Sequence, residues 1–201
     1  MTKLIGIIKI TNSRGEVVCE QRMHSFVQNF AYLLNGLCNK SLPNNGVGTP
    51  IKDTSNVSCS AGAYISSSTW YNWYNSAPTA AGIDAYGMVI GTGFTPVALT
   101  DYILAVQIAN GTAGGQMQYM AMSYQIGKIS SGANRAYKLI RCFINSSGGA
   151  ITVKEVGFIA RPYNTGVGPY NVLICRDVLG APVAVNNGEL ITVEMSFQIT
   201  A

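Results

Sequence analysis

The sequence predicts a mainly β protein: a single antiparallel β-sandwich of the jelly-roll type, with two short helices and a long loop region rich in aromatic residues. Short apolar runs recur along the chain and are divided by turns rich in glycine, asparagine and proline. The last run, residues 190–199, alternates apolar and polar residues as a half-buried strand does. No internal repeat or linker is visible in the sequence, so we expect residues 1–201 to form one domain.

The first expected element is a hairpin. KLIGIIKI (3–10) and VVCEQRM (17–23) are apolar strands, and NSRGE (12–16), with Gly15, supplies the turn between them.

A helix over residues 25–36 is expected next. Ser25 and Gln28 have capping-box spacing, in which each side chain bonds a backbone N–H that the helix start leaves free. Asn35-Gly36 supplies a stop. One helical stripe contains the apolar residues Phe26, Phe30, Leu33, Leu34 and Leu37. His24, the only histidine, precedes the cap, so we interpret it as a boundary residue and not as a catalytic group.

Residues from about 39 to 85 differ from the rest and predict a loop-rich insertion with at most one or two short strands. Its aromatic residues stand among serine and asparagine, and they are the candidates for an interface or a glycan site: Tyr64, Trp70, Tyr71, Trp73 and Tyr74. Such side chains stack on sugars, anchor protein interfaces, or fold back to close one end of a β core. The sequence leaves these three interpretations open.

Residues 86–111 contain Gly91-Thr92-Gly93, which resembles part of a phosphate-binding loop. The third glycine is missing and Pro96 interrupts the pattern, so both nucleotide-binding templates fail. We expect instead a strand that ends at Gly91, a turn through Pro96, and a second short helix capped by Thr100, with Asp101 in its first turn.

The remaining residues predict a series of strands. Residues 135–145 and 150–160 flank an SSGG turn and predict a second hairpin, and residues 120–126, 171–178 and 190–199 predict further strands. The alternation slips at Glu155, which indicates a β-bulge. We expect the Glu155 carboxylate to accept hydrogen bonds from nearby backbone amides and not to take part in catalysis.

Charged residues make up 11% of the chain, about half the usual share, whereas hydrophobic residues make up 48%. Scarce charge indicates surface covered by neighbouring proteins, or else a coat of neutral polar residues. The net charge of +4 comes from scattered lysine and arginine, which predicts no specific nucleic-acid binding.

Five cysteines lie far apart, without the spacing of a disulfide framework, and predict reduced thiols in a cytoplasmic chain: Cys19, Cys38, Cys59, Cys142 and Cys175. The apolar run at the N-terminus is too short for a signal peptide or a membrane span.

Catalytic chemistry is not predicted. The nine carboxylates are dispersed, and no pair is spaced to suggest an acid and a base. A single histidine cannot form a histidine-rich metal site. We therefore expect a protein that is not an enzyme and has no catalytic residue, cofactor or metal.

Four stretches follow one another in the order MHSFVQNFAYLLNG, VIGTGFTPVALTDYILAVQIANG, INSSGGAITVKEVGFIA, and LICRDVL with PVAVNNGELITVEMSFQITA. The last two contain a polar turn, a strand with EVG, a strand with RDV, and a closing strand after NG. This order resembles small virion structural proteins of tailed phages and related viruses, namely head-decoration, head-fibre, neck and tail accessory proteins. The resemblance covers the first helix and most of residues 86–201, but not residues 39–85.

The resemblance implies a non-enzymatic virion protein that decorates the capsid surface, forms a fibre base, or belongs to the neck or tail. Its partners would be other virion proteins (capsid, neck or tail) and copies of itself, with a trimer favoured; no membrane is implied. It would fold in the host cytoplasm, without a signal peptide, and reside in the virion. The alternative is a host-recognition module that binds surface glycans through its aromatic loop.

Overall fold

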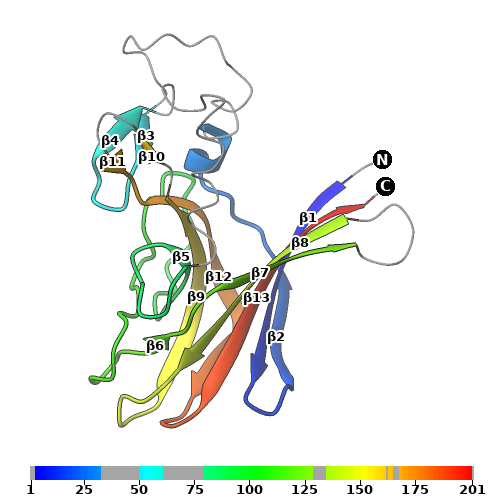
Figure 1. Ribbon diagram of the computed structural model, residues 1–201, viewed down its shortest axis with the longest axis vertical. Coiled ribbons are helices and arrows are strands. Elements are labelled where there is room, and N and C mark those ends of the chain that lie inside the picture. The colour runs from blue at the N-terminus through cyan, green and yellow to red at the C-terminus, as the bar shows by residue number, and fades with distance from the viewer. Residues whose placement is uncertain are drawn as a thin grey trace.

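The computed structural model describes residues 3–32, 50–60, 79–128, 135–161, 163–164 and 168–200. These residues are mainly β, as the sequence predicts, and form two main antiparallel sheets (Figure 1). A shared hydrophobic core joins the two sheets.

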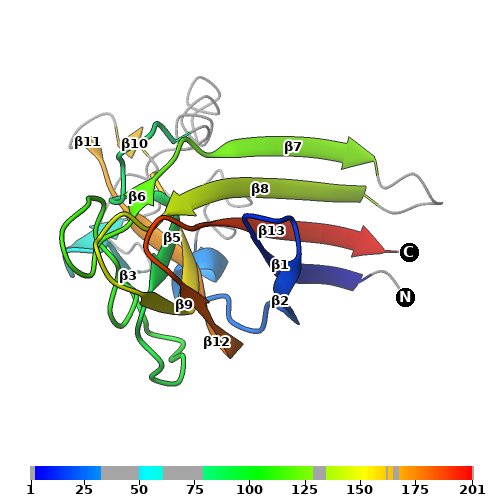
Figure 2. The same cartoon turned by 90° about the horizontal axis from the view of Figure 1, so that it is seen from below.

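The larger sheet has six strands in the order β2-β1-β13-β8-β6, and β7 also pairs with β8. Its strands are β1 (Lys3–Asn12), β2 (Val17–Arg22), β6 (Gln118–Tyr119), β7 (Ser123–Lys128), β8 (Arg135–Ile144) and β13 (Leu190–Thr200). Figure 2 shows β1, β13, β8 and β7 side by side, with both chain ends at the same end of the sheet. The closing strand β13 is therefore an inner strand, bonded on both sides, and not an edge.

The smaller sheet has three strands in the order β12-β9-β5. They are β5 (Gly87–Gly91), β9 (Ile151–Ala160) and β12 (Val172–Val185). Two further pairs are β3 (Pro50–Lys52) with β4 (Ser58–Ser60), and β10 (Tyr163–Asn164) with β11 (Gly168–Pro169). The short strands β3 and β4 fall in the region where the sequence predicts at most one or two.

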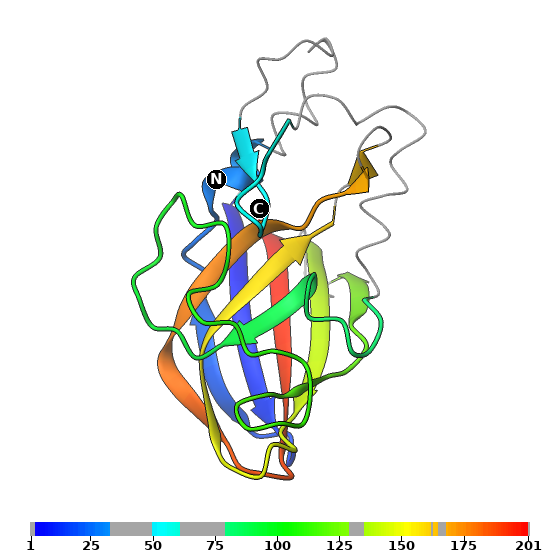
Figure 3. The same cartoon turned by 90° about the vertical axis from the view of Figure 1, so that its left-hand side faces the viewer.

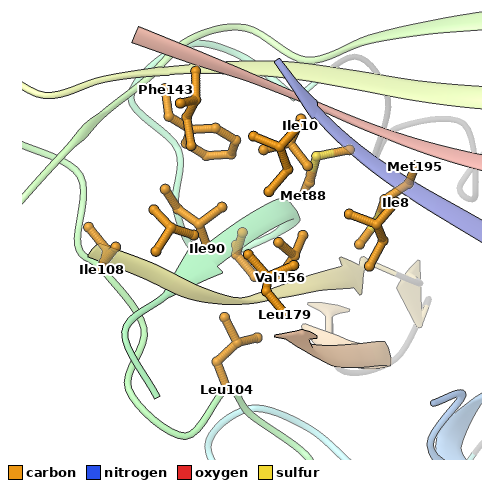
Figure 4. Close-up of a cluster of buried hydrophobic side chains, with 14 of the residues drawn as sticks. Ile8, Ile10, Met88, Ile90, Leu104, Ile108, Phe143, Val156, Leu179 and Met195 are labelled. Atoms are coloured by element: carbon orange, nitrogen blue, oxygen red, sulfur yellow. The ribbon is translucent and has the colours of Figure 1, made fainter. Parts of the chain in front are cut away.

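The core lies between the inner faces of the two sheets (Figure 4). The predicted alternation of the closing strand holds for its first three apolar residues, since Ile191, Val193 and Met195 are buried. They share the core cluster with Ile90 and Val156 of the smaller sheet. Burial of such side chains stabilises the fold by roughly 1.5–3 kcal/mol each.

The first predicted hairpin is confirmed: β1 and β2 pair antiparallel, with a register shift at Ile10/Thr11. Gly15 has φ 79°, a turn conformation that glycine adopts without strain.

The second predicted hairpin, over residues 135–160, is wrong. β8 pairs with β13, β6 and β7, whereas β9 belongs to the other sheet. The turn between them carries the chain from one sheet to the other because the buried Asn145 holds it there. Its Nδ2 donates to the carbonyl oxygens of Gly149 and, from β12, Val185, at 2.8 and 2.7 Å.

The first predicted helix starts later than expected. Residues 28–32 are helical, and the predicted stop at residues 35–36 lies outside the described residues. Ser25 is not a helix cap, because residues 25–27 run along β12 in an extended conformation. The Ser25 carbonyl accepts a bond from the Arg176 N–H, and the Val27 N–H donates to Ile174. Pairing with β12 therefore outweighs the local capping signal.

The second predicted helix, at Thr100–Asp101, is wrong. Residues 99–100 form a turn, and no helix follows before β6. Asp101 does not stand in the first turn of a helix; its carboxylate accepts a bond from Ala98 N and binds Arg176.

Candidate interaction surface

Residues 92–109 form an irregular loop across the outer side of the smaller sheet, which we call the anchored loop (Figure 3). Leu104 and Ile108 of this loop are buried and belong to the core cluster. Figure 4 shows Leu104 below β9, on the side away from Ile10 and Phe143. The anchored loop is therefore packed on the sheet as an additional layer.

Glu155 of β9 holds both arms of the anchored loop. Its carboxylate is fully buried. Oε1 accepts bonds from Gly93 N at 3.1 Å and Val106 N at 2.8 Å. Oε2 accepts bonds from Ala105 N at 3.1 Å and from Arg176 Nε at 2.6 Å. Glu155 accepts hydrogen bonds from backbone amides as predicted, but these amides are not nearby in sequence: they lie 62, 50 and 49 residues away.

Arg176 of β12 links Glu155 to the tip of the loop. Its side chain is 2% exposed. Besides Glu155, it binds Asp101 through Nη1 at 2.6 Å, and its Nη2 donates to the Thr95 carbonyl and hydroxyl oxygens at 3.0 and 3.1 Å. Charge-assisted bonds of this kind are about twice as strong as neutral ones. The buried ions therefore fix the loop at both arms and at its tip.

Three glycines allow this close packing. A Cβ on Gly91 would lie 2.5 Å from Glu155 Oε1, and one on Gly93 would meet the same oxygen. A Cβ on Gly157 would lie 2.5 Å from Leu104 Cδ1. Gly91 ends β5 as predicted. The glycines of Gly91-Thr92-Gly93 form a turn and also allow the backbone to lie close to the Glu155 carboxylate.

The predicted register slip near Glu155 is also present. The pairing of β9 with β12 jumps between Val178↔Glu155 and Val183↔Val153. Most of the extra residues stand on β12, at Leu179–Pro182, and not on β9 as the sequence pattern suggests. This irregularity turns Glu155 outward, toward the anchored loop.

The anchored loop exposes four large apolar side chains. Phe94 is 71% exposed, Leu99 66%, Val106 56% and Ile103 42%. Within the described part of the chain, these four residues are a large share of the exposed large hydrophobic side chains. We call them the apolar patch. An ordered loop that presents several apolar side chains to solvent is typical of a surface that binds another molecule.

The chain segment that contains the patch is poor in charged residues. Between Asp84 and Lys128 the sequence contains one charged residue, Asp101, which shares Arg176 with Glu155. The nearby Lys154 Nζ lies 5.0 Å from the centre of the Phe94 ring. Depletion of charge is characteristic of the centre of protein interfaces.

The outer face of the larger sheet has the opposite character. Lys9 stands between Glu20 and Glu194 on the neighbouring strands, and Lys138 Nζ lies 2.8 Å from Glu194 Oε1. Interleaved charges of both signs are typical of a solvated sheet face. The two outer faces of the molecule therefore differ in polarity.

His24 acquires an acidic neighbour through the fold, which the sequence did not reveal. Its backbone N–H donates to Asp177 Oδ1 at 2.9 Å, and His24 itself is exposed. Burial raises the pKa of the Asp177 carboxyl, and the amides of His24 and Ser25 oppose that shift. Asp177 thus binds the main chain that leaves β2.

Other buried polar groups also serve the fold. The Arg141 side chain donates to the carbonyl oxygens of Met120 and Met88 at 2.8 and 2.9 Å and lies over the Tyr119 ring. Burial lowers the pKa of Arg141 to about 10.

Cys19, Cys142 and Cys175 are free thiols. Burial raises the pKa values of Cys19 and Cys175, which makes their thiols less reactive. In the described residues no three metal-binding side chains cluster, and no helix there is long and apolar enough to span a membrane.

The aromatic candidates predicted from the sequence, Tyr64, Trp70, Tyr71, Trp73 and Tyr74, lie outside the described residues. The structure instead brings together residues that the sequence analysis did not connect: Glu155, Arg176 and Asp101. The motifs EVG and RDV place the opposite charges of Glu155 and Arg176 on two strands, but the sequence did not show that these strands pair.

No family model, curated protein or solved structure matches this chain. Its function is therefore inferred from its own residues.

Proposed function

We propose that the protein is a non-enzymatic structural protein of a tailed-phage particle and acts through protein–protein assembly. It would decorate the capsid surface, form the base of a fibre, or serve in the neck or tail. The observation that carries the assembly role is the anchored loop: a loop fixed by buried ions that exposes four large apolar side chains. A surface that is already ordered loses little conformational entropy on binding.

The virion assignment is supported by the resemblance of the sequence to phage virion proteins. The motifs that carry this resemblance include EVG and RDV. In this chain Glu155, Gly157 and Arg176 of those motifs are residues that hold or contact the anchored loop. We also propose the jelly-roll type of sandwich for the arrangement of the two sheets.

A non-enzymatic role is supported by how the buried charges are used. The Glu155 carboxylate accepts four hydrogen bonds from the protein itself, and Arg176 binds two carboxylates. Groups whose bonding capacity is met within the fold serve as structural supports.

The proposal is tested by quantitative mass spectrometry of purified phage particles from cells that express the protein. We expect the chain at a copy number that matches the symmetry of the head, neck or tail. A chain that stays in the lysate and is absent from purified particles would contradict the virion role. The copy number also separates a head location from a tail location.

A further inference from the structure

We infer that the outer edge of β7 binds an extended acidic segment of a different protein, which adds to the larger sheet as a further strand. The inference goes beyond the proposed function, because it gives the chain a contact that is separate from the anchored loop. Two observations carry it: the edge that β7 presents and the charge of the residues beside that edge.

β7 is an outer strand of the larger sheet. Within the described residues it pairs with β8 alone, and Figure 2 shows it outermost among β1, β13, β8 and β7. Its pairing runs from Ser123↔Ile140 to Lys128↔Arg135 without a register shift, and residues 123–128 contain no proline. Bulges and prolines are usual devices that stop an edge from pairing. The outer N–H and C=O groups of β7 are therefore placed to pair with a polypeptide strand, which a nucleic acid or a lipid cannot supply.

The end of the larger sheet beside this edge carries basic residues. Lys128 stands directly opposite Arg135 in the last pair of β7 and β8, and like charges in that position destabilise a sheet. Lys3 stands at the corresponding end of β1. No aspartate or glutamate occurs in the strand ends that form this part of the sheet: residues 3–7, 125–128, 135–138 and 196–200. An acidic residue beside Lys128 would offset the repulsion.

The chain itself has no acidic strand to supply. All nine aspartates and glutamates lie among the described residues. Glu20 stands opposite Lys9 on β1. The others each bind a donor within the fold: Glu16, Asp53, Asp84, Asp101, Glu155, Asp177, Glu189 and Glu194. Two β7 strands from two copies would bring only lysine to the contact, since residues 123–128 contain no acidic residue. A different protein is therefore a better match than a second copy.

The register of β7 predicts the sequence pattern of this partner. Residues 124, 126 and 128 fall on one face of the strand. Ile126 stands opposite Tyr137, which is 37% exposed, and Tyr124 stands opposite the buried Leu139. An antiparallel partner strand would place an acidic residue beside Lys128 and apolar residues beside Ile126 and Tyr124. The expected pattern is an acidic residue followed by apolar residues at the second and fourth positions after it.

NMR titration of the full isotope-labelled chain with short synthetic peptides tests the inference. The probe is the capped peptide Thr-Glu-Thr-Val-Thr-Val-Thr, and the matched probe has lysine in place of glutamate. We expect the first peptide to shift the amide signals of residues 123–128 and to bind at least about tenfold more tightly than the second. Lys128→Glu should reverse this preference. Lys154→Glu makes the same change of charge on β9 of the smaller sheet and should keep it.

The stability of Lys128→Glu separates binding from folding. A glutamate opposite Arg135 replaces two like charges by an opposite pair, so this variant should be at least as stable as the wild type. Urea unfolding of both proteins measures the difference. Arg135→Glu repeats the titration if Lys128→Glu does not fold.

Three results would overturn the inference: no shift of residues 123–128 with the glutamate peptide, equal binding of the two peptides, or a preference that Lys128→Glu leaves unchanged. Binding of a DNA oligonucleotide or of a second copy at β7, in place of the peptide, would also overturn it. None of these results removes the proposed function, because that function depends on the presence of the chain in purified particles. Absence from particles would in turn leave peptide binding unaffected.

Discussion

Glu155→Gln should release the anchored loop, although the two side chains have almost the same shape. Each carboxylate oxygen of Glu155 accepts two hydrogen bonds, from Gly93 and Val106 on one side and from Ala105 and Arg176 on the other. Glutamine has one oxygen, so its NH₂ group must face two donors. The substitution therefore converts two attractive contacts into donor–donor repulsion and removes one of the two carboxylates that pair with Arg176.

The magnitude follows from these bonds. A hydrogen bond to a charged group contributes about 1.5–3 kcal/mol, and removal of one member of a buried ion pair costs about 3–5 kcal/mol. We expect Glu155→Gln to lower the free energy of unfolding by about 3–5 kcal/mol. That is a large part of the roughly 5–15 kcal/mol that keeps a domain folded.

Urea unfolding measures the global effect, and hydrogen exchange of the Gly93, Ala105 and Val106 amides measures the local one. The control is Glu194→Gln, which removes an ion pair with Lys138 on the half-exposed sheet face. This pair should contribute less than about 1 kcal/mol.

The double variant Glu155→Leu/Arg176→Met provides the decisive comparison. Apolar replacement of both members of a buried ion pair is often nearly neutral. Here three loop amides would still lose their acceptor, each at about 1–3 kcal/mol. We therefore expect the double variant to remain unstable. Recovery to within about 1 kcal/mol of the wild type would refute the role of Glu155 as the anchor of the loop.

Three further outcomes are expected. Gly93→Ala should lower the melting temperature because its Cβ would meet Glu155, whereas Gly114→Ala should not, because the space around Gly114 is open. Equal melting temperatures of the two variants would contradict the close-packing explanation. Because the pKa of folded Asp177 is raised above 3.8, the wild type loses stability as the pH rises from about 4 through that pKa, and Asp177→Asn does not. Urea unfolding measures the free energy of unfolding of both proteins at pH 4 and pH 7. The free energy of Asp177→Asn relative to the wild type should be higher at pH 7 than at pH 4, and an equal difference at both pH values would be inconsistent with a raised pKa. Deletion of residues 190–201 removes an inner strand and should give insoluble protein, so a soluble, folded truncation would contradict the placement of β13.

Local patterns in the sequence predicted the strands but not all of their partners. The burial of Ile191, Val193 and Met195 and the hairpin of residues 3–22 depend on neighbours close in sequence or on a single buried face, and both are present in the structure. The alternation does not continue to Ser196, which is also buried. The prediction of a hairpin over residues 135–160 was wrong because a turn signal shows where a chain reverses, not which sheet the next strand joins. Contacts of Asn145 with β12 decide that point.

The candidate site was predictable only in part. The slip in alternation at Glu155 correctly indicated a carboxylate bound to backbone amides. Its partner Arg176 could not be identified, because pairing of β9 with β12 is a tertiary event. Thr100–Asp101 suggested a helix cap for a related reason: an aspartate that accepts a nearby backbone amide gives the same local signal in a helix start and in a loop.

The position of β13 has a consequence for biosynthesis. The pairing of β1 with β13 joins Lys3 to Thr200, so two strands that are far apart in sequence must meet before the larger sheet is complete. During translation β1 and β8 emerge well before the strand that separates them, and each then has an unpaired edge. Pairings between residues so distant in sequence form slowly. Until β13 has been synthesised and has paired, those edges can pair with the strands of other chains.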